Sequence, residues 1–300
     1  MHITRNRGVS LVSTLWVMVM LLFVSLSHAG AQEQAGRADA APAAAAEEEE
    51  RPTASLGVDI LSQYIWRGFA LSRQSAVLQP SMTVGYKGFS VNFWGNFDTS
   101  ENAPAAITPR TGAKWNETDF TFGYSRDIYK GDVIKALTLD VGGIYYAYDG
   151  TIYPQGDSFE IYYGLAADFQ VVTLSIMGNS EVSHYPGTWL TVGLSRVFEL
   201  PYYNSTLELG NSYVFLFSRD GAAFPRRPLS APNSTTAFSG PLAGHVYATL
   251  TIPVHKYVSV SPKIGFWYGL GGNSTELLRW ASWDVQQNHV YGGLNLNFAF

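Results

Sequence analysis

Residues 289–300 read HVYGGLNLNFAF, and apolar and polar side chains alternate through most of this stretch. Leu294 and Leu296 fall on one face of an extended chain, whereas Asn295 and Asn297 fall on the other. A period of two residues is typical of a strand that has one apolar and one polar face. The stretch therefore predicts a β-strand rather than a helix.

The same alternation returns along the chain, and after Ala54 no apolar run is long enough for a transmembrane helix. The polar faces carry mostly Gly, Ser, Thr, Asn and Tyr, as in a barrel with a polar interior and a lipid-facing exterior. A sheet in hydrocarbon must close and leave no edge. We therefore predict an all-β fold, a transmembrane antiparallel up-and-down β-barrel. The expected strands are 55–66, 75–86, 88–97, 115–126, 136–148, 158–169, 170–179, 189–199, 205–216, 243–252, 256–268 and 288–300.

Twelve strands is an even number, as expected for a single-chain bacterial barrel with both ends in the periplasm. The expected connections alternate between short turns and long loops, and the long ones are 98–114, 217–242 and 269–287. Ten or fourteen strands remain alternatives, because 98–135 and 217–288 could each hide a hairpin.

The composition limits the other classes of protein. Only 14% of the residues are charged, yet the mean hydropathy is zero, so apolar residues must be interleaved with polar ones. The chain has no cysteine, which excludes disulfides and cysteine-ligated metal sites. A net charge of −5 gives no indication of nucleic-acid binding.

The N-terminal part predicts export from the cytoplasm. Residues 1–29 combine Arg5 and Arg7 with an apolar run and a small-residue cleavage site, the pattern of a cleaved signal peptide. An uncleaved inner-membrane anchor is the alternative. Residues 30–54 are rich in Ala and Glu and predict a disordered periplasmic tether. The barrel is expected over 55–300.

Aromatic residues gather near both ends of the expected strands, as in the two girdles of a membrane barrel. Phe298 and Phe300 resemble the C-terminal signal read by the outer-membrane assembly machinery, although Asn295 stands where that signal usually has Gly. The expected girdle residues are Tyr64, Trp66, Trp115, Tyr148 and Trp189 on the outer side and Tyr86, Phe198, Tyr257 and Phe300 on the periplasmic side.

The stretch 62–68, Ser-Gln-Tyr-Ile-Trp-Arg-Gly, resembles an uncharacterised family of proteobacterial outer-membrane β-barrel proteins. That family opens its barrel with a Ser-Asp-Tyr-x-Phe-Arg-Gly-like first strand. Gln79 and the stretch 94–96 are similar to its next characteristic segments, while Gln63, Trp66 and Ala70 depart from the pattern. The resemblance covers about residues 56–97 and implies a barrel without implying any biochemical activity.

Several charged residues are expected to line the barrel interior, because they share the polar face of their strands or end the first strand. They could brace the barrel as a buried polar network, or their excess of carboxylates could form a constriction that favours cations. Arg67 could pair with one of the carboxylates. The expected lumen-lining residues are Asp59, Arg67, Glu117, Asp119, Asp140, Glu160, Glu208 and Lys263.

These patterns favour a narrow passive channel for small hydrophilic solutes, with a possible preference for cations. The alternative is a structural or surface-binding barrel plugged by bulky inward side chains, namely Trp94, Tyr146, Tyr162 and Trp267. A lipid-modifying enzyme is less favoured, because no Ser-His pair falls on the lipid-facing side. We predict no catalytic residues, cofactor or metal, and no nucleic-acid partner. The expected partners are outer-membrane lipid, lipopolysaccharide and the assembly machinery, in the Gram-negative outer membrane; the sequence leaves the oligomeric state open.

Overall fold

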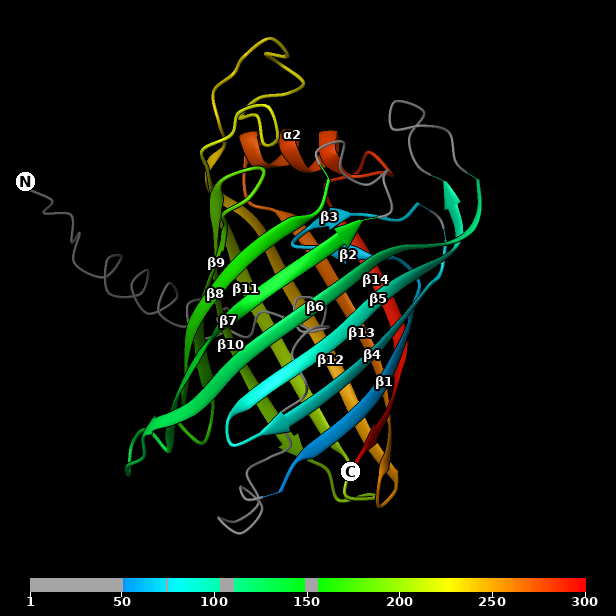
Figure 1. The fold of residues 1–300 in the computed structure, drawn as a ribbon, viewed down its shortest axis with the longest axis vertical. Coiled ribbons are helices and arrows are strands. Elements are labelled where there is room, and N and C mark those ends of the chain that lie inside the picture. The colour runs from blue at the N-terminus through cyan, green and yellow to red at the C-terminus, as the bar shows by residue number, and fades with distance from the viewer. Residues whose placement is uncertain (1–50, 74, 103–110, 149–155) are drawn as a thin grey trace, which may run out of the picture.

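The computed structural model describes residues 51–73, 75–102, 111–148 and 156–300. The signal peptide and most of the tether expected from the sequence lie outside the described residues. Within them, twelve antiparallel strands form one closed barrel (Figure 1). The barrel strands are β1 (Thr53–Leu61), β4 (Val77–Tyr86), β5 (Phe89–Asn102), β6 (Thr111–Tyr129), β7 (Ala136–Tyr148), β8 (Ser158–Asp168), β9 (Thr173–Glu181), β10 (Gly187–Glu199), β11 (Thr206–Ser218), β12 (Ser239–His255), β13 (Val258–Gly269) and β14 (His289–Ala299).

Each strand pairs with its neighbours in sequence, and β1 pairs with β14 to close the ring, from Ser55 opposite Ala299 to Leu61 opposite Gly293. The prediction of a twelve-stranded up-and-down barrel is confirmed, and the alternatives of ten and fourteen strands are wrong. Closure pairs the backbone groups of both terminal strands, so the barrel presents no sheet edge to hydrocarbon.

The predicted alternation of faces is also present. On β5, Phe89 and Phe93 are exposed on the outside of the barrel, whereas Asn92 and Trp94 are each 3% exposed. Strands that alternate apolar outside and polar inside are the architecture of outer-membrane barrels.

The two ends of the barrel differ (Figure 1). At the turn end, strands are joined closely; Lys87 and Gly88 form a two-residue turn between β4 and β5, with φ of 50° and 84°. The other end, which we call the loop end, carries the segments 219–238 and 270–288. Long loops lie on the extracellular side in barrels of this class, which assigns the loop end to the outside.

The expected first strand, 55–66, is wrong in its second half. β1 ends at Leu61, and the chain then forms two short strands, β2 (Ile65–Trp66) and β3 (Phe69–Ala70), which pair only with each other in the described structure. The sequence also gave no sign of helix α2 (Gly272–Ala281), which lies across the loop end (Figure 1). No helix in the described part of the chain is long and apolar enough to cross a membrane.

The predicted aromatic girdle is only partly correct. Trp115, Tyr86, Tyr257 and Phe300 are exposed, as interface residues should be. Tyr64, Trp66 and Trp189 were expected in the outer girdle, but they are buried at 3%, 6% and 1% exposure. These three rings belong to a hydrophobic cluster inside the barrel.

Candidate functional site: the hairpin inside the barrel

Strands β2 and β3 form a hairpin whose tip is Arg67-Gly68. Trp66 pairs with Phe69 across the tip, and Ile65 pairs with Ala70. Arg67 and Gly68 have φ of 48° and 94°. Positive φ at both central residues is the pattern of a type I′ turn, which suits the twist of a two-residue hairpin. Gly adopts this conformation freely, whereas Arg does so at a cost of about 1–2 kcal/mol.

The hairpin crosses the interior of the barrel. It leaves from β1 and returns to β4, and its residues contact strands distributed around the rest of the ring. The contacts are Tyr64 with Trp94 of β5, Arg67 with Glu160 of β8 and Trp66 with Trp189 of β10, and Gly68 lies so close to Ala243 of β12 that a Cβ added to it would meet the Ala243 side chain. A segment that touches the wall on all these sides must lie across the lumen.

Arg67 holds the tip of the hairpin to the wall. Its two terminal nitrogens donate to the two carboxylate oxygens of Glu160, at 2.7 and 2.8 Å. The guanidinium also lies over the rings of Trp66 and Trp189, at 4.5 and 5.0 Å from their centroids. Both charged side chains are 1% exposed. A planar guanidinium suits this position, because it can pair with a carboxylate bidentately and stack on aromatic faces at the same time.

Glu160 accepts two further hydrogen bonds, so its buried charge is well satisfied. Tyr146 donates its hydroxyl at 2.9 Å, and Asn179 donates its amide at 3.2 Å. These partners come from β7 and β9, the strands on either side of Glu160. A buried ion pair is tolerable only when its remaining hydrogen-bonding capacity is used in this way.

Aromatic rings pack around the hairpin at the loop end. Phe69 and Trp189 each contact the other and both Trp66 and Phe224, with ring centroids 5.1 to 6.3 Å apart. Phe224 comes from the loop 219–238, so the loop and the hairpin share one buried cluster. Edge contacts of this kind add to the stabilisation given by burial itself.

Residues 282–284, which follow helix α2, contact the hairpin from the loop end of the barrel. Ala70 donates its amide to the hydroxyl of Ser282 at 3.1 Å, and its carbonyl accepts from the amide of Trp283 at 2.9 Å. The side-chain amide of Gln63 donates to Asp284 at 2.9 Å. The hairpin is therefore fixed both to the wall and to the loops.

Asp284 lies in a loop, outside the strands that span the membrane. Burial alone would raise the pKa of its carboxyl, but hydrogen bonds from His289 and Gln63 outweigh that effect and lower the pKa below its ordinary value. The carboxylate form is therefore the one that holds Gln63.

The other predicted lumen residues fall into two sets. Lys263 lies 2.6 Å from Asp59, and Glu208 accepts the hydroxyl of Tyr247 at 2.8 Å. Glu117, Asp119 and Asp140 are buried at 1%, 8% and 6% exposure, on β6 and β7. Lys263 and Arg67 are thus both engaged with acids other than these three.

His245 forms a second interior group that the sequence did not single out as functional. Its ring lies flat against Trp267, with centroids 4.0 Å apart, and its Nε2 is 3.1 Å from the hydroxyl of Tyr291. Its position on the inward face of β12 was visible in the sequence pattern, but the stack requires β13 and β14 as well. In the described residues, no three acidic or histidine side chains are grouped so as to hold a metal ion.

Solved structures that match the whole barrel do so distantly. The NanC porin is 9% identical with a TM-score of 0.46, over 81% of this chain and 98% of that one. A KdgM porin is 9% identical with a TM-score of 0.46, over 82% and 99% of the two chains. An outer-membrane channel from Pseudomonas putida F1 is 8% identical with a TM-score of 0.45, over 84% and 96%.

Among curated proteins, no match was found. A family model does match this sequence over residues 45–195, which include β1, the hairpin and the wall strands β4 to β9. Its description is "Bacterial protein of unknown function (Gcw_chp)". The match covers half of the sequence, and the chain therefore belongs to this bacterial family of unknown function.

Proposed function

We propose that the protein is a narrow outer-membrane channel for small hydrophilic solutes that is held closed by its own hairpin. The observation that carries the proposal is the bidentate pair between Arg67 at the hairpin tip and Glu160 on the wall. A twelve-stranded barrel is intermediate in width between small barrels filled by side chains and larger ones with an aqueous channel. A single inserted segment is therefore enough to decide whether solute passes.

The connection between β1 and β4 is longer than the barrel requires, which supports a gating role. Leu61 and Val77 are register partners, so a short turn could join the two strands directly. The chain instead forms the hairpin β2–β3 between them, and this hairpin enters the lumen. A buried ion pair is also a poor source of stability compared with apolar packing of similar volume, and it is better suited to specifying one arrangement over another.

A plugged structural barrel without transport is the second candidate. The aromatic cluster of Trp66, Phe69, Trp189 and Phe224 favours it, because so much buried apolar surface makes the closed arrangement stable. Trp94, Tyr146 and Trp267, which we expected to plug the lumen from the wall, are also buried. The lipid-modifying enzyme stays the least favoured reading: His245 and His289 are buried, and His289 pairs with Asp284.

Conductance of the purified protein in a planar bilayer separates the two candidates. The native chain should be mostly silent. A variant in which residues 63–73 are replaced by a short Gly-Ser turn should conduct steadily, and Glu160→Gln should open more often than the native chain because it leaves Arg67 buried without its partner. Glu208→Gln, which alters an acid that the hairpin does not contact, serves as the control. A silent hairpin-free barrel that folds normally would favour the structural candidate.

We also propose that residues 1–29 are removed as a signal peptide during export, and that outer-membrane lipid and lipopolysaccharide surround the barrel. The support is the basic and apolar pattern of the N-terminal residues together with the apolar outer face of the strands. The N-terminal sequence of the protein purified from outer membranes tests the cleavage. An intact Met1 would contradict it.

A further inference from the structure

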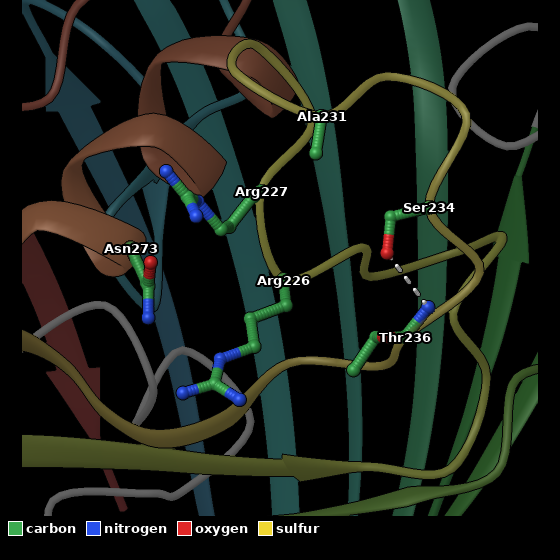
Figure 2. A pocket seen from close by; sticks show the side chains of 6 residues that line it. All are labelled: Arg226, Arg227, Ala231, Ser234, Thr236 and Asn273. Carbon is green, nitrogen blue, oxygen red and sulfur yellow. Dashed lines mark hydrogen bonds between the residues drawn. The ribbon is translucent and has the colours of Figure 1, made fainter.

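A hollow of about 430 Å³ opens at the loop end, between the loop 219–238 and the start of helix α2 (Figure 2). It lies outside the hairpin contacts described above. Most of its lining side chains are polar or charged: Arg226, Arg227, Ala231, Ser234, Thr236 and Asn273. A volume of this size is in the usual range for a small-molecule site.

The charge of this hollow is opposite to that of the chain. The protein carries a formal net charge of −5, yet the hollow has two adjacent arginines in its lining and no lining acid. Figure 2 shows both arginine side chains extending from the loop toward the side of the hollow where Asn273 lies. Both arginines line the same hollow, and their positive charges favour an anion there.

The two arginines differ in how far the protein itself satisfies them. Arg227 donates its Nε to the hydroxyl of Ser230 at 3.1 Å. Glu276 of helix α2 accepts hydrogen bonds from the amide and hydroxyl of Ser230, the closest at 2.7 Å, and its negative charge also interacts with Arg227. Within the described residues, no hydrogen bond or ion pair engages the guanidinium of Arg226. Arg226 therefore keeps its full capacity for a bidentate contact with an oxyanion.

The surroundings of the arginines add neutral hydrogen-bonding groups. Ser234, Thr236 and Asn273 supply hydroxyl and amide groups that can donate and accept. Helix α2 begins beside the hollow, with no acidic residue in its first turn. A ligand that carries both an anionic group and several hydroxyls matches this lining better than a bare anion or an apolar molecule.

We propose that this hollow binds a phosphorylated saccharide, with Arg226 and Arg227 contacting the phosphate and the polar lining contacting the sugar. Guanidinium groups recognise phosphate by parallel N–H···O bonds, which gives such a site geometric as well as electrostatic selectivity. The ligand can come from two sources at the cell surface. One is a soluble sugar phosphate, and the other is the phosphorylated sugar of lipopolysaccharide in the outer leaflet.

Calorimetric titration of the full chain in detergent with glucose 1-phosphate tests the proposal. Saturable binding is expected at millimolar concentration, and glucose should bind at least about tenfold more weakly because it lacks the charge. The double variant Arg226→Gln/Arg227→Gln should weaken glucose 1-phosphate binding by about tenfold or more. Arg219→Gln, which removes an exposed arginine of the same loop outside the hollow, should leave binding unchanged.

Competition with purified lipopolysaccharide identifies the source. Displacement of glucose 1-phosphate from the native chain by lipopolysaccharide assigns the lipid, and saturable binding without displacement assigns a soluble ligand. The proposal is overturned if the native chain shows no saturable binding, if glucose binds as tightly as its phosphate, or if the double variant binds as the native chain does. Both arginines are exposed loop residues, and an unchanged thermal unfolding curve verifies that the variant is folded.

Discussion

Arg67 combines an unfavourable backbone conformation with side-chain contacts that attach the hairpin to the barrel wall. Its left-handed backbone conformation is unfavourable for a residue with a Cβ, and its side chain compensates through Glu160 and two tryptophan rings. Strained backbone tends to persist where the surrounding contacts determine it, and such places are often functional. A single substitution in this ion pair should therefore have a large effect on the stability of the closed barrel.

Replacing Glu160 by Gln should lower the free energy of unfolding by about 3–5 kcal/mol, because it leaves the Arg67 charge buried without its partner. Lys130→Gln removes a surface pair with Asp127, in which the two side chains are 67% and 30% exposed, and should cost no more than about 1 kcal/mol. Denaturant titration of both variants in detergent micelles measures the difference. Equal losses would mean that the Arg67 pair contributes no more than a surface contact.

Asp284 gives a prediction for pH. The pKa of its carboxyl is lowered in the folded protein, so the stabilisation is fully present above the ordinary carboxyl range and is lost as the pH falls through the folded value. The native chain should be more stable than Asp284→Asn at pH 6, and this advantage should shrink below about pH 4. Thermal unfolding of the two proteins across this range tests the sign. An advantage that stayed constant or grew on acidification would contradict it.

At the scale of elements, the hairpin β2–β3 is the feature that separates this barrel from an open one. Ala70 is fully buried, and the sequence contains no cysteine, so a single Ala70→Cys reports on the hairpin alone. A membrane-impermeant maleimide should leave this thiol unlabelled in the folded protein and label it after denaturation. Asn233→Cys on the exposed outer loop should react at once. Equal labelling rates at the two positions would place the hairpin outside the lumen.

The sequence predicted the wall strands but not the hairpin, and the reason is physical. Wall strands meet lipid on one face and a polar interior on the other. Each of them therefore shows an alternation of apolar and polar residues that can be recognised from its own sequence. In residues 62–68 the aromatic residues Tyr64 and Trp66 continue the alternation of β1, so the pattern predicts that the strand extends through this segment. What turns it inward are contacts with Trp94, Glu160 and Trp189, which are distant in sequence.

Helix α2 was not predicted from the sequence, for a related reason. Its ten residues are GNSTELLRWA, its cap Gly271 has no side-chain hydrogen bond, and no acid lies in its first turn. Short helices without such signals are marginal on their own and depend on packing. Leu277 and Leu278, both fully buried, supply that packing against the interior cluster.

At the scale of the whole molecule, the interior holds more acids than bases. Lys263 and Arg67 are engaged by Asp59 and Glu160, whereas Glu117 and Asp119 lie buried next to each other on β6. Once the hairpin is removed and water enters, these two acids should stabilise passing cations.

In the hairpin-free barrel, Glu117→Gln/Asp119→Asn should therefore reduce the cation preference, read as a smaller reversal potential in a salt gradient. Asp132→Asn, on an exposed turn, is the control, and an unchanged reversal potential in the double variant would remove these acids from the selectivity.

If the position of the hairpin decides whether the barrel conducts, a reversible cross-link between the hairpin tip and the wall should switch the current off and on. A Cβ at Gly68 would lie 2.8 Å from that of Ala243, about 1 Å closer than the spacing that a disulfide prefers, and the φ of 94° at Gly68 is unfavourable for a side chain. The tip must therefore shift slightly to form the bond, and the native chain has no competing cysteine. The measurement is the single-molecule conductance of Gly68→Cys/Ala243→Cys in the Glu160→Gln background, before and after a reductant is added to the same bilayer. The oxidised barrel should be silent and should begin to conduct on reduction, because breaking the bond frees the hairpin tip. Identical currents in the oxidised and reduced states would mean that the hairpin does not control conduction.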